Sequence, residues 1–268
     1  MMSGGDPRCA SLAFSLPLLH RPFFLGRQAA ARRHPPGLLL MPETWLIPID
    51  SYCERLSPAF WAEPLNAVTN GAFLAAALYA LVLWRRAGAS DWPSLWLIAV
   101  TFMVGIGSFL FHTFANSWSL LADVLPIAVF IYSYFLLAMR RYLRLGLAAA
   151  IAATVLFAAF NMSFDRLWSA VLPGVTLNGS VSYIPAALAL LAVGILCMLR
   201  NVRDAGRALL LAACAFALSL VFRSIDGAVC SALPVGTHFL WHGLNAVVLG
   251  LLMRAAIAHT FRKKPFHA

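Results

Sequence analysis

The sequence predicts an all-α membrane protein with seven transmembrane helices. The chain is 62% hydrophobic and only 11% charged, and its mean hydropathy is +0.81, whereas soluble domains carry about 25% charged residues. Seven apolar segments approach the roughly 20 residues that a helix needs to cross about 30 Å of hydrocarbon. No segment shows the alternating ~10-residue pattern of a membrane β-barrel, so helices are the expected spanning elements.

The predicted spans are apolar runs separated by short polar or basic connections. The second run ends in "GIGSFLFHTF", the third begins with "SLLADVLP" and the last begins with "THFLWHG". The fourth run is the shortest. The seven spans cover about residues 65–84, 94–114, 119–139, 145–161, 181–199, 206–223 and 237–258.

The net charge of +10 reflects membrane topology and not nucleic-acid binding. Twelve of the twenty basic residues form clusters that follow the first, third, fifth and seventh spans. All four clusters therefore lie on one side of the membrane, which the positive-inside rule makes the cytoplasm. We expect the N-terminus outside and the C-terminus inside, in a bacterial inner membrane with the periplasm on the outer side. The clusters are Arg85 and Arg86; Arg140, Arg141 and Arg144; Arg200, Arg203 and Arg207; and Arg254, Arg262, Lys263 and Lys264.

Residues 1–40 do not fit this topology, because their five arginines oppose export. They contain no clean signal-peptide cleavage site. Met41 directly precedes "PETWLIPIDSYCER", and we expect the functional chain to begin near it. The remaining chain divides into an extracytoplasmic segment (41–64), the seven-helix domain (65–258) and a basic cytoplasmic tail (259–268).

Five polar side chains from three different spans are predicted to lie at the same depth near the outer surface. Ser108 and His112 end the second span, Asp123 lies one turn into the third, and His238 and His242 begin the seventh. Ionisable groups within membrane spans are costly and are functional by default. This shared depth is the main sequence signal for a site.

The three histidines are predicted to bind zinc. A spacing of four places His238 and His242 on one face of a helix, as in the two-histidine part of helical zinc motifs. Adding His112 gives three neutral nitrogen ligands and leaves a fourth position for water, the arrangement of catalytic rather than structural zinc. The alternative for each histidine taken singly is packing in the core.

Asp123 and Ser108 are the predicted catalytic partners of this metal. Zinc lowers the pKa of a bound water toward about 7, and Asp123 is placed to act as general base for that water or as acid for a leaving amine. Ser108 lies one turn from His112 and would orient the water or stabilise an oxyanion. The alternative for Ser108 is close helix packing beside Gly105 and Gly107.

The segment 50–70 concentrates carboxylate and amide side chains, which are ligands that suit calcium. It lacks the ligand spacing and glycine of an EF-hand, and an acidic entry to the first helix is the alternative interpretation. Cys53 in this segment and Cys230 before the last span are both predicted on the outer side, where disulfides persist.

Several motifs, in the same order, resemble those of the alkaline ceramidases, within a superfamily of seven-helix membrane hydrolases that includes adiponectin-receptor-like proteins. The motifs are "DSYCE", "WAEPLNAVTN", "GIGSFLFHTF" with Asp123 eleven residues after His112, "RSIDGAVC" and "THFLWHG". The resemblance covers about residues 48–258, and "YCE…E…N" distinguishes the ceramidase branch.

The resemblance implies a zinc ion held by His112, His238 and His242, with Ser108 and Asp123 around the water. It implies hydrolysis of the amide of an N-acyl sphingoid base to a fatty acid and a sphingoid base, with the lipid entering from the membrane. It also implies a disulfide between Cys53 and Cys230. A calcium site beside the zinc would use Asp50, the carbonyl of Tyr52, Glu54 and Glu63.

The chain departs from the family pattern D-W-C-E-x-N at the implied calcium site. An extra residue separates Asp50 from Tyr52, and Leu56 stands where asparagine is usual. Two alternatives to a ceramide hydrolase are a hydrolase of another N-acyl lipid and a non-catalytic seven-helix receptor with a structural zinc.

Overall fold

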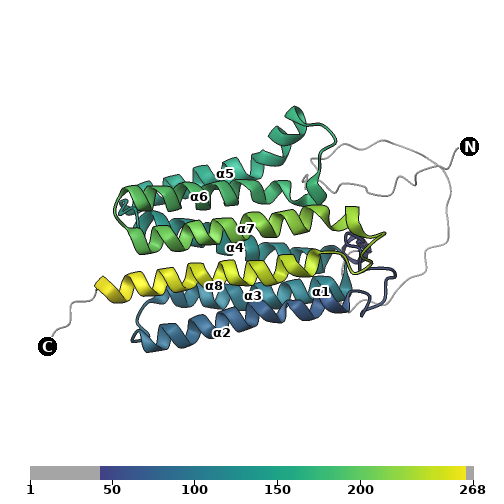
Figure 1. The fold of residues 1–268 in the computed structure, drawn as a ribbon, viewed down its shortest axis with the longest axis horizontal. Coiled ribbons are helices and arrows are strands. Elements are labelled where there is room, and N and C mark those ends of the chain that lie inside the picture. Colours follow the sequence, from purple (N-terminus) through teal and green to yellow (C-terminus); the bar gives the residue numbers. More distant parts are fainter. Residues whose placement is uncertain (1–42, 264–268) are drawn as a thin grey trace, which may run out of the picture.

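The computed structural model describes residues 43–263. The expected start at Met41 and the extension 1–40 lie outside the described residues. Within them, seven helices are long and apolar enough to cross a membrane, and no strand is present. Figure 1 shows these helices running along the long axis of one elongated bundle. The predicted fold class is confirmed.

The helix bounds agree with the predicted spans at most ends. The fourth span differs most, since it continues ten residues past the predicted end at 161, through the polar residues Asp165 and Arg166. The sixth and seventh spans end six and five residues past their predicted ends. The first span is interrupted at Asn70, where a short helix passes into a longer one. The helices are α1 (Pro64–Thr69), α2 (Gly71–Arg86), α3 (Trp92–Phe114), α4 (Ser117–Arg141), α5 (Leu147–Val171), α6 (Ile184–Leu199), α7 (Arg203–Val229) and α8 (His238–Lys263). Short 3-10 turns cover Glu43–Leu46, Leu177–Gly179 and Val181–Tyr183.

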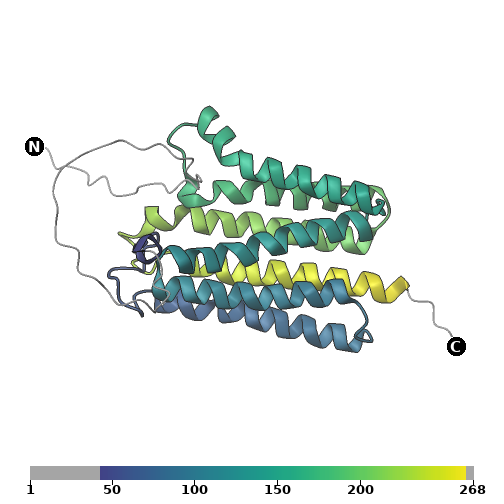
Figure 2. The same cartoon turned by 180° about the vertical axis from the view of Figure 1, so that it is seen from behind.

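The last helix lies against three of the other spans. α8 packs on α7, α2 and α3, while α3 also packs on α4 and α6 packs on α7. α5 is peripheral, because only 6% of the residues in its most apolar stretch are buried within the protein. Its main partner among the spans is α4. Figures 1 and 2 show α5 and α6 along one edge of the bundle and α2 along the opposite edge.

Arginine side chains gather at one end of the bundle, which we call the basic end, where α2, α4, α6 and α8 finish. Arg141 pairs with Asp91 there, with Nη2 to Oδ1 at 2.7 Å, and also donates to the carbonyl of Ala256 at 2.8 Å. Arg200 donates to the carbonyl of Leu143 at 3.0 Å. The described arginines of the four predicted clusters therefore gather at one end, as the charge pattern predicted, and Arg141 ties α3, α4 and α8 together.

The opposite end, which we call the histidine end, is covered by residues 43–63. Pro48 forms a bridge with Asn116, and the amide of Ile49 donates to the carbonyl of Ala115 at 2.7 Å. A disulfide joins Cys53 to Cys230, as the resemblance implied. The segment before the first helix is thereby fixed to the α3–α4 turn and to the end of α7.

Candidate metal centre

The three predicted zinc ligands converge at the histidine end. One ligand atom from each of His112, His238 and His242 lies within 4.8 Å of the others, and each side chain is about 1% exposed. His112 comes from the last turns of α3 and the other two from the first turns of α8, which packs on α3. Within residues 43–263 this is the only cluster of histidine, cysteine or carboxylate side chains with a geometry able to hold a metal ion.

Two of the histidines are oriented by hydrogen bonds to their Nδ1 atoms. Nδ1 of His112 lies 2.6 Å from Oε2 of Glu63 and donates to that carboxylate. The hydroxyl of Thr69 donates to the carbonyl of Leu65 at 2.8 Å, so it accepts from Nδ1 of His242 at 2.9 Å. Both rings then present an Nε2 lone pair, the tautomer that metal-binding histidines adopt when an outer partner holds the other nitrogen.

The third ring, His238, is held by stacking. The ring of Tyr52 lies on it with centroids 3.6 Å apart and planes 17° apart. Within the described part of the chain, Nδ1 of His238 is buried without a hydrogen-bond partner. Because buried polar atoms are rarely left unsatisfied, this orphaned nitrogen fits a cluster that a metal ion completes.

Asp226 is buried at the end of α7. Its exposure is 0%, and its carboxylate accepts three backbone N–H groups. Oδ1 accepts from Thr237 at 2.6 Å and from His238 at 2.9 Å, and Oδ2 accepts from Cys53 at 3.1 Å. The carboxylate therefore caps the N-terminus of α8 and positions a candidate ligand. Asp226 lies within the "RSIDGAVC" motif, but the partners of its carboxylate are backbone groups that a sequence does not reveal.

Ser108 and Asp123 also meet at this depth, from facing helices. The Ser108 hydroxyl interacts with the half-buried Asp123 carboxylate. Oδ1 of Asp123 has no hydrogen-bond partner among residues 43–263. The close approach depends on Gly107, since a Cβ there would lie 2.0 Å from the carbonyl oxygen of Ala122. The arrangement leaves one carboxylate oxygen free to accept a proton beside His112.

The four residues expected to bind calcium do not form an ion site. Asp50 is exposed. Both carboxylate oxygens of Glu54 accept backbone N–H groups at the start of α1, from Leu65 and Asn66, at 2.7 and 2.8 Å. The carbonyl of Tyr52 accepts the N–H of Arg55 at 3.2 Å. These oxygens already accept hydrogen bonds within the protein, and the guanidinium of Arg55 takes the place of a cation beside Glu63, so the four residues do not fit a calcium ion.

Glu63, the fourth of these residues, is fully engaged by other side chains. Oε1 accepts from Nε of Arg55, and Oε2 accepts from His112 and from Nδ2 of Asn66 at 3.1 Å. Burial raises the pKa of Glu63, but the hydrogen bonds and charges of His112 and Arg55 outweigh burial, so the pKa lies below its usual range. Glu63 is an ionised carboxylate that supports His112.

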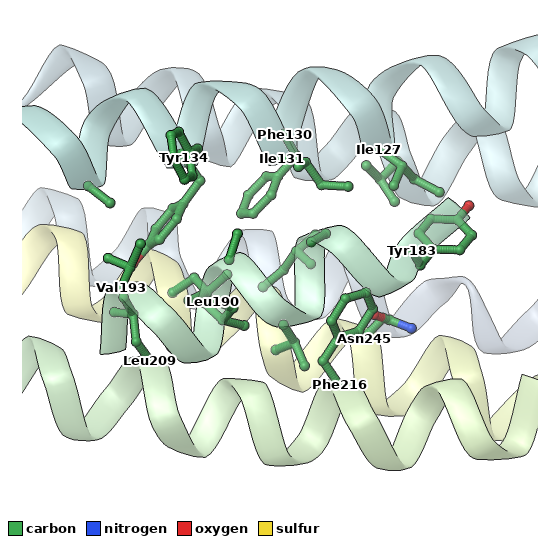
Figure 3. Close-up of a pocket in the computed structure, with 18 of the residues that line it drawn as sticks. Ile127, Phe130, Ile131, Tyr134, Tyr183, Leu190, Val193, Leu209, Phe216 and Asn245 are labelled. Carbon is green, nitrogen blue, oxygen red and sulfur yellow. The ribbon is translucent and has the colours of Figure 1, made fainter. Parts of the chain in front are cut away.

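An apolar pocket lies among the helices between the histidine end and the basic end, with about 850 Å³ of space outside protein atoms, part of it open to the surroundings. Phe73, whose ring contacts His242, and Trp241 lie at its histidine side. Figure 3 shows Ile127, Phe130, Ile131 and Tyr134 of α4 facing Leu190 and Val193 of α6 across the cavity, with the amide of Asn245 nearby. This lining suits hydrocarbon.

Arg223 of α7 lies between the pocket and the histidines. Its guanidinium is 5.2–5.6 Å from the ring centroids of Tyr52, Tyr183 and Trp241. It also donates to the Tyr52 hydroxyl at 2.7 Å. Arg223 therefore holds the ring that stacks on His238. Its place in an apolar span was a sequence signal that the prediction of the site did not use.

Two further supporting residues, Arg55 and Thr69, were also absent from the predicted site. Thr69 precedes the interruption of the first span, and Arg55 follows the "YCE" motif. Both act through side-chain contacts with residues more than 50 positions away in the chain, Thr69 with His242 and Arg55 with His112. No local pattern predicts such contacts.

Comparison with known proteins gives one match. The family model described as Ceramidase matches residues 51–261, a range that contains all three histidines, Ser108, Asp123 and both bridged cysteines. No curated protein and no solved structure matches the chain.

Proposed function

Because the chain belongs to the Ceramidase family, we propose that it is a zinc-dependent amidohydrolase that cleaves the N-acyl bond of ceramide-type lipids within the membrane. The observation that carries this proposal is that two features of the structure lie close together. A buried cluster of three histidines lies next to Phe73 and Trp241, two residues that line an apolar pocket. Together they would place a polar bond at a metal while a hydrocarbon chain stays among the helices.

The donor set favours zinc. Three neutral imidazoles without cysteine are typical of catalytic zinc sites. Glu63 and Thr69, which accept hydrogen bonds from Nδ1 of His112 and His242, are the outer partners that such ligands have. When bound, zinc supplies Lewis-acid polarisation of the carbonyl and activation of water. His112, His238 and His242 would hold it.

Asp123 is the proposed proton carrier. Its free Oδ1 would accept a proton from the attacking water as the water oxygen bonds to the carbonyl carbon. The carboxyl would then deliver the proton to the nitrogen as the carbon–nitrogen bond breaks, giving a fatty acid and a sphingoid base. Ser108, which interacts with the Asp123 carboxylate, would help to orient it toward the substrate.

The pocket supports a lipid substrate with at least one long chain. Its wall consists of aliphatic and aromatic side chains, with few polar groups such as Asn245 and the tyrosine hydroxyls. A single buried chain gains about 0.8 kcal/mol per CH₂ moved out of water, but a lipid already in hydrocarbon gains little. We therefore propose that the pocket orients the amide of the substrate and contributes little to the affinity for it.

The positive-inside rule favours a cytoplasmic basic end. The histidine end and the disulfide would then face the opposite side, the periplasm if the protein lies in a bacterial inner membrane. The disulfide agrees with this orientation, because disulfides persist in oxidising compartments.

The test is hydrolysis of a panel of N-acyl lipids by the purified full-length protein, with zinc content measured on the same sample. We expect release of fatty acid from a ceramide, about one zinc per chain, and loss of activity in His242→Ala and Asp123→Asn. Asp165→Asn, an exposed carboxylate in α5, is the matched control and should retain activity.

The same panel separates the alternatives. A folded, zinc-loaded protein that releases no fatty acid would overturn the enzymatic proposal and favour a receptor. Cleavage of a different N-acyl lipid, with ceramides left intact, would keep the chemistry and replace the substrate.

A further inference from the structure

Arg55 lies in a cage of oxygen atoms beside the histidine cluster. Its side chain is 4% exposed, and its Nε pairs with Oε1 of Glu63. Nη1 donates to the carbonyls of Ser57 at 3.2 Å and Ala59 at 3.5 Å, and Nη2 donates to the carbonyl of His112 at 3.1 Å. One carboxylate and three backbone carbonyls are the kind of oxygen set that hard divalent cations take in proteins. Here a guanidinium occupies it.

The guanidinium contacts the candidate metal ligand by two routes. Through Glu63 it reaches Nδ1 of His112, and through Nη2 it reaches the backbone carbonyl of the same residue. Glu63 is 2% exposed, and a buried carboxylate without a cation is strongly unfavourable. Arg55 neutralises it and directs its second oxygen toward the imidazole. The planar fork of the guanidinium makes these contacts at once, which an ammonium group cannot do.

We infer that Arg55 is a built-in replacement for a divalent cation, so that the centre depends on the histidine-bound metal alone and works without calcium. This inference rests on the proposed function for its effect on hydrolysis, but its structural part concerns only how the metal ligands are held. Arg55 is a positioning residue that acts through Glu63 on His112. The guanidinium would repel a calcium ion placed beside it, and the other oxygens that the sequence assigned to calcium accept hydrogen bonds within the protein, apart from those of the exposed Asp50.

The first test uses the unaltered full-length protein. Calcium chloride is titrated into the purified, calcium-free sample while thermal unfolding and bound calcium are followed. We expect no stoichiometric calcium binding, no shift of the unfolding midpoint, and the same rate of ceramide hydrolysis with and without calcium. One calcium bound per chain at submillimolar concentration, or hydrolysis that requires calcium, would overturn the inference.

The second test removes the guanidinium. Arg55→Ala should weaken zinc affinity by about 10–100-fold, the range found when outer partners of metal ligands are lost. Free guanidinium ion should restore part of that affinity, and Arg55→Lys should retain only part of it. Arg140→Ala is the matched control, because Arg140 is an exposed arginine at the basic end that donates to one backbone carbonyl. Its zinc affinity should equal that of the unaltered protein.

These readouts separate the two proposals. Unchanged zinc affinity in a folded Arg55→Ala protein refutes the role of Arg55, whatever the enzyme hydrolyses. Weakened affinity in a protein that cleaves no N-acyl lipid refutes the proposed function and leaves Arg55 as the support of His112. If Arg55→Ala does not fold, Arg55→Lys and the calcium titration of the unaltered protein decide the question.

Discussion

Replacing Asp226 tests how the last helix is positioned for metal binding. In Asp226→Ala, the N–H groups of Cys53, Thr237 and His238 lose the carboxylate that accepts them. A buried donor left without a partner costs about 1–3 kcal/mol, so three donors set a range of about 3–9 kcal/mol. Water can enter the space left by the side chain, and we expect the free energy of unfolding to fall by about 3–5 kcal/mol.

The assay is denaturant unfolding in mixed micelles, together with zinc affinity. Asp226→Asn retains one acceptor oxygen for the start of α8 and loses the bond to Cys53, so it should lose about 1–3 kcal/mol. Zinc affinity should fall roughly 10-fold in Asp226→Ala, because the backbone of His238 is no longer held. Asp165→Ala is the control and should change stability by less than about 0.5 kcal/mol.

The reasoning would be refuted by an Asp226→Ala protein that unfolds within about 1 kcal/mol of the unaltered protein, the lower limit for even one orphaned donor. Loss of stability with unchanged zinc affinity would refute the second part, that the cap positions His238. The disulfide joins Cys53 to Cys230 and includes no residue of α8, so it does not replace the lost hydrogen bonds to Thr237 and His238.

Three further predictions concern helix packing, the basic end and the pocket. Gly107→Ala should destabilise the protein by about 1–3 kcal/mol through overpacking and abolish hydrolysis by separating α3 from α4. Gly243→Ala is the control: a Cβ there meets no described atom within 4 Å, so this variant should be neutral in the same assays. Burial raises the pKa of Asp91, but its bonds to Arg141, Ser94 and Thr260 outweigh burial and lower the pKa below 3.8. The stability that the ionised Asp91 provides is therefore complete above pH 3.8. It is lost as the pH falls through the pKa of the folded state. Asp91→Asn should accordingly lower stability by about 2–4 kcal/mol at neutral pH, a difference that shrinks below pH 3.8 in unfolding measurements, and a constant difference would contradict the ion pair. Leu190→Trp should fill the pocket and reduce hydrolysis of long-chain substrates much more than that of a short-chain analogue; equal losses for both would show that the pocket does not hold the chain.

Much of the candidate site was predictable because its residues break the apolar pattern. His112, His238, His242 and Asp123 are ionisable groups in spans, and the alternation of basic clusters placed them at one depth. The geometry does not support the calcium interpretation of Glu54 and Glu63. A carboxylate can be stabilised by backbone N–H groups, by a cationic side chain or by a metal ion, and the sequence does not say which of these it meets. Backbone N–H groups satisfy Glu54, while Arg55 and His112 engage Glu63. Composition does not distinguish these partners from an ion.

By itself, the sequence determined the seven spans, the end at which the basic residues gather and the depth of the histidines. The physical reason is that these properties depend on distance along single helices, each residue advancing about 1.5 Å. Only the tertiary structure decided which nitrogen of His112 and His242 is held by a partner, where Asp226 is buried, and that a guanidinium fills the oxygen cage beside Glu63. Those outcomes depend on contacts between segments up to 173 residues apart, where packing and hydrogen-bond geometry select one partner among several that the chain offers.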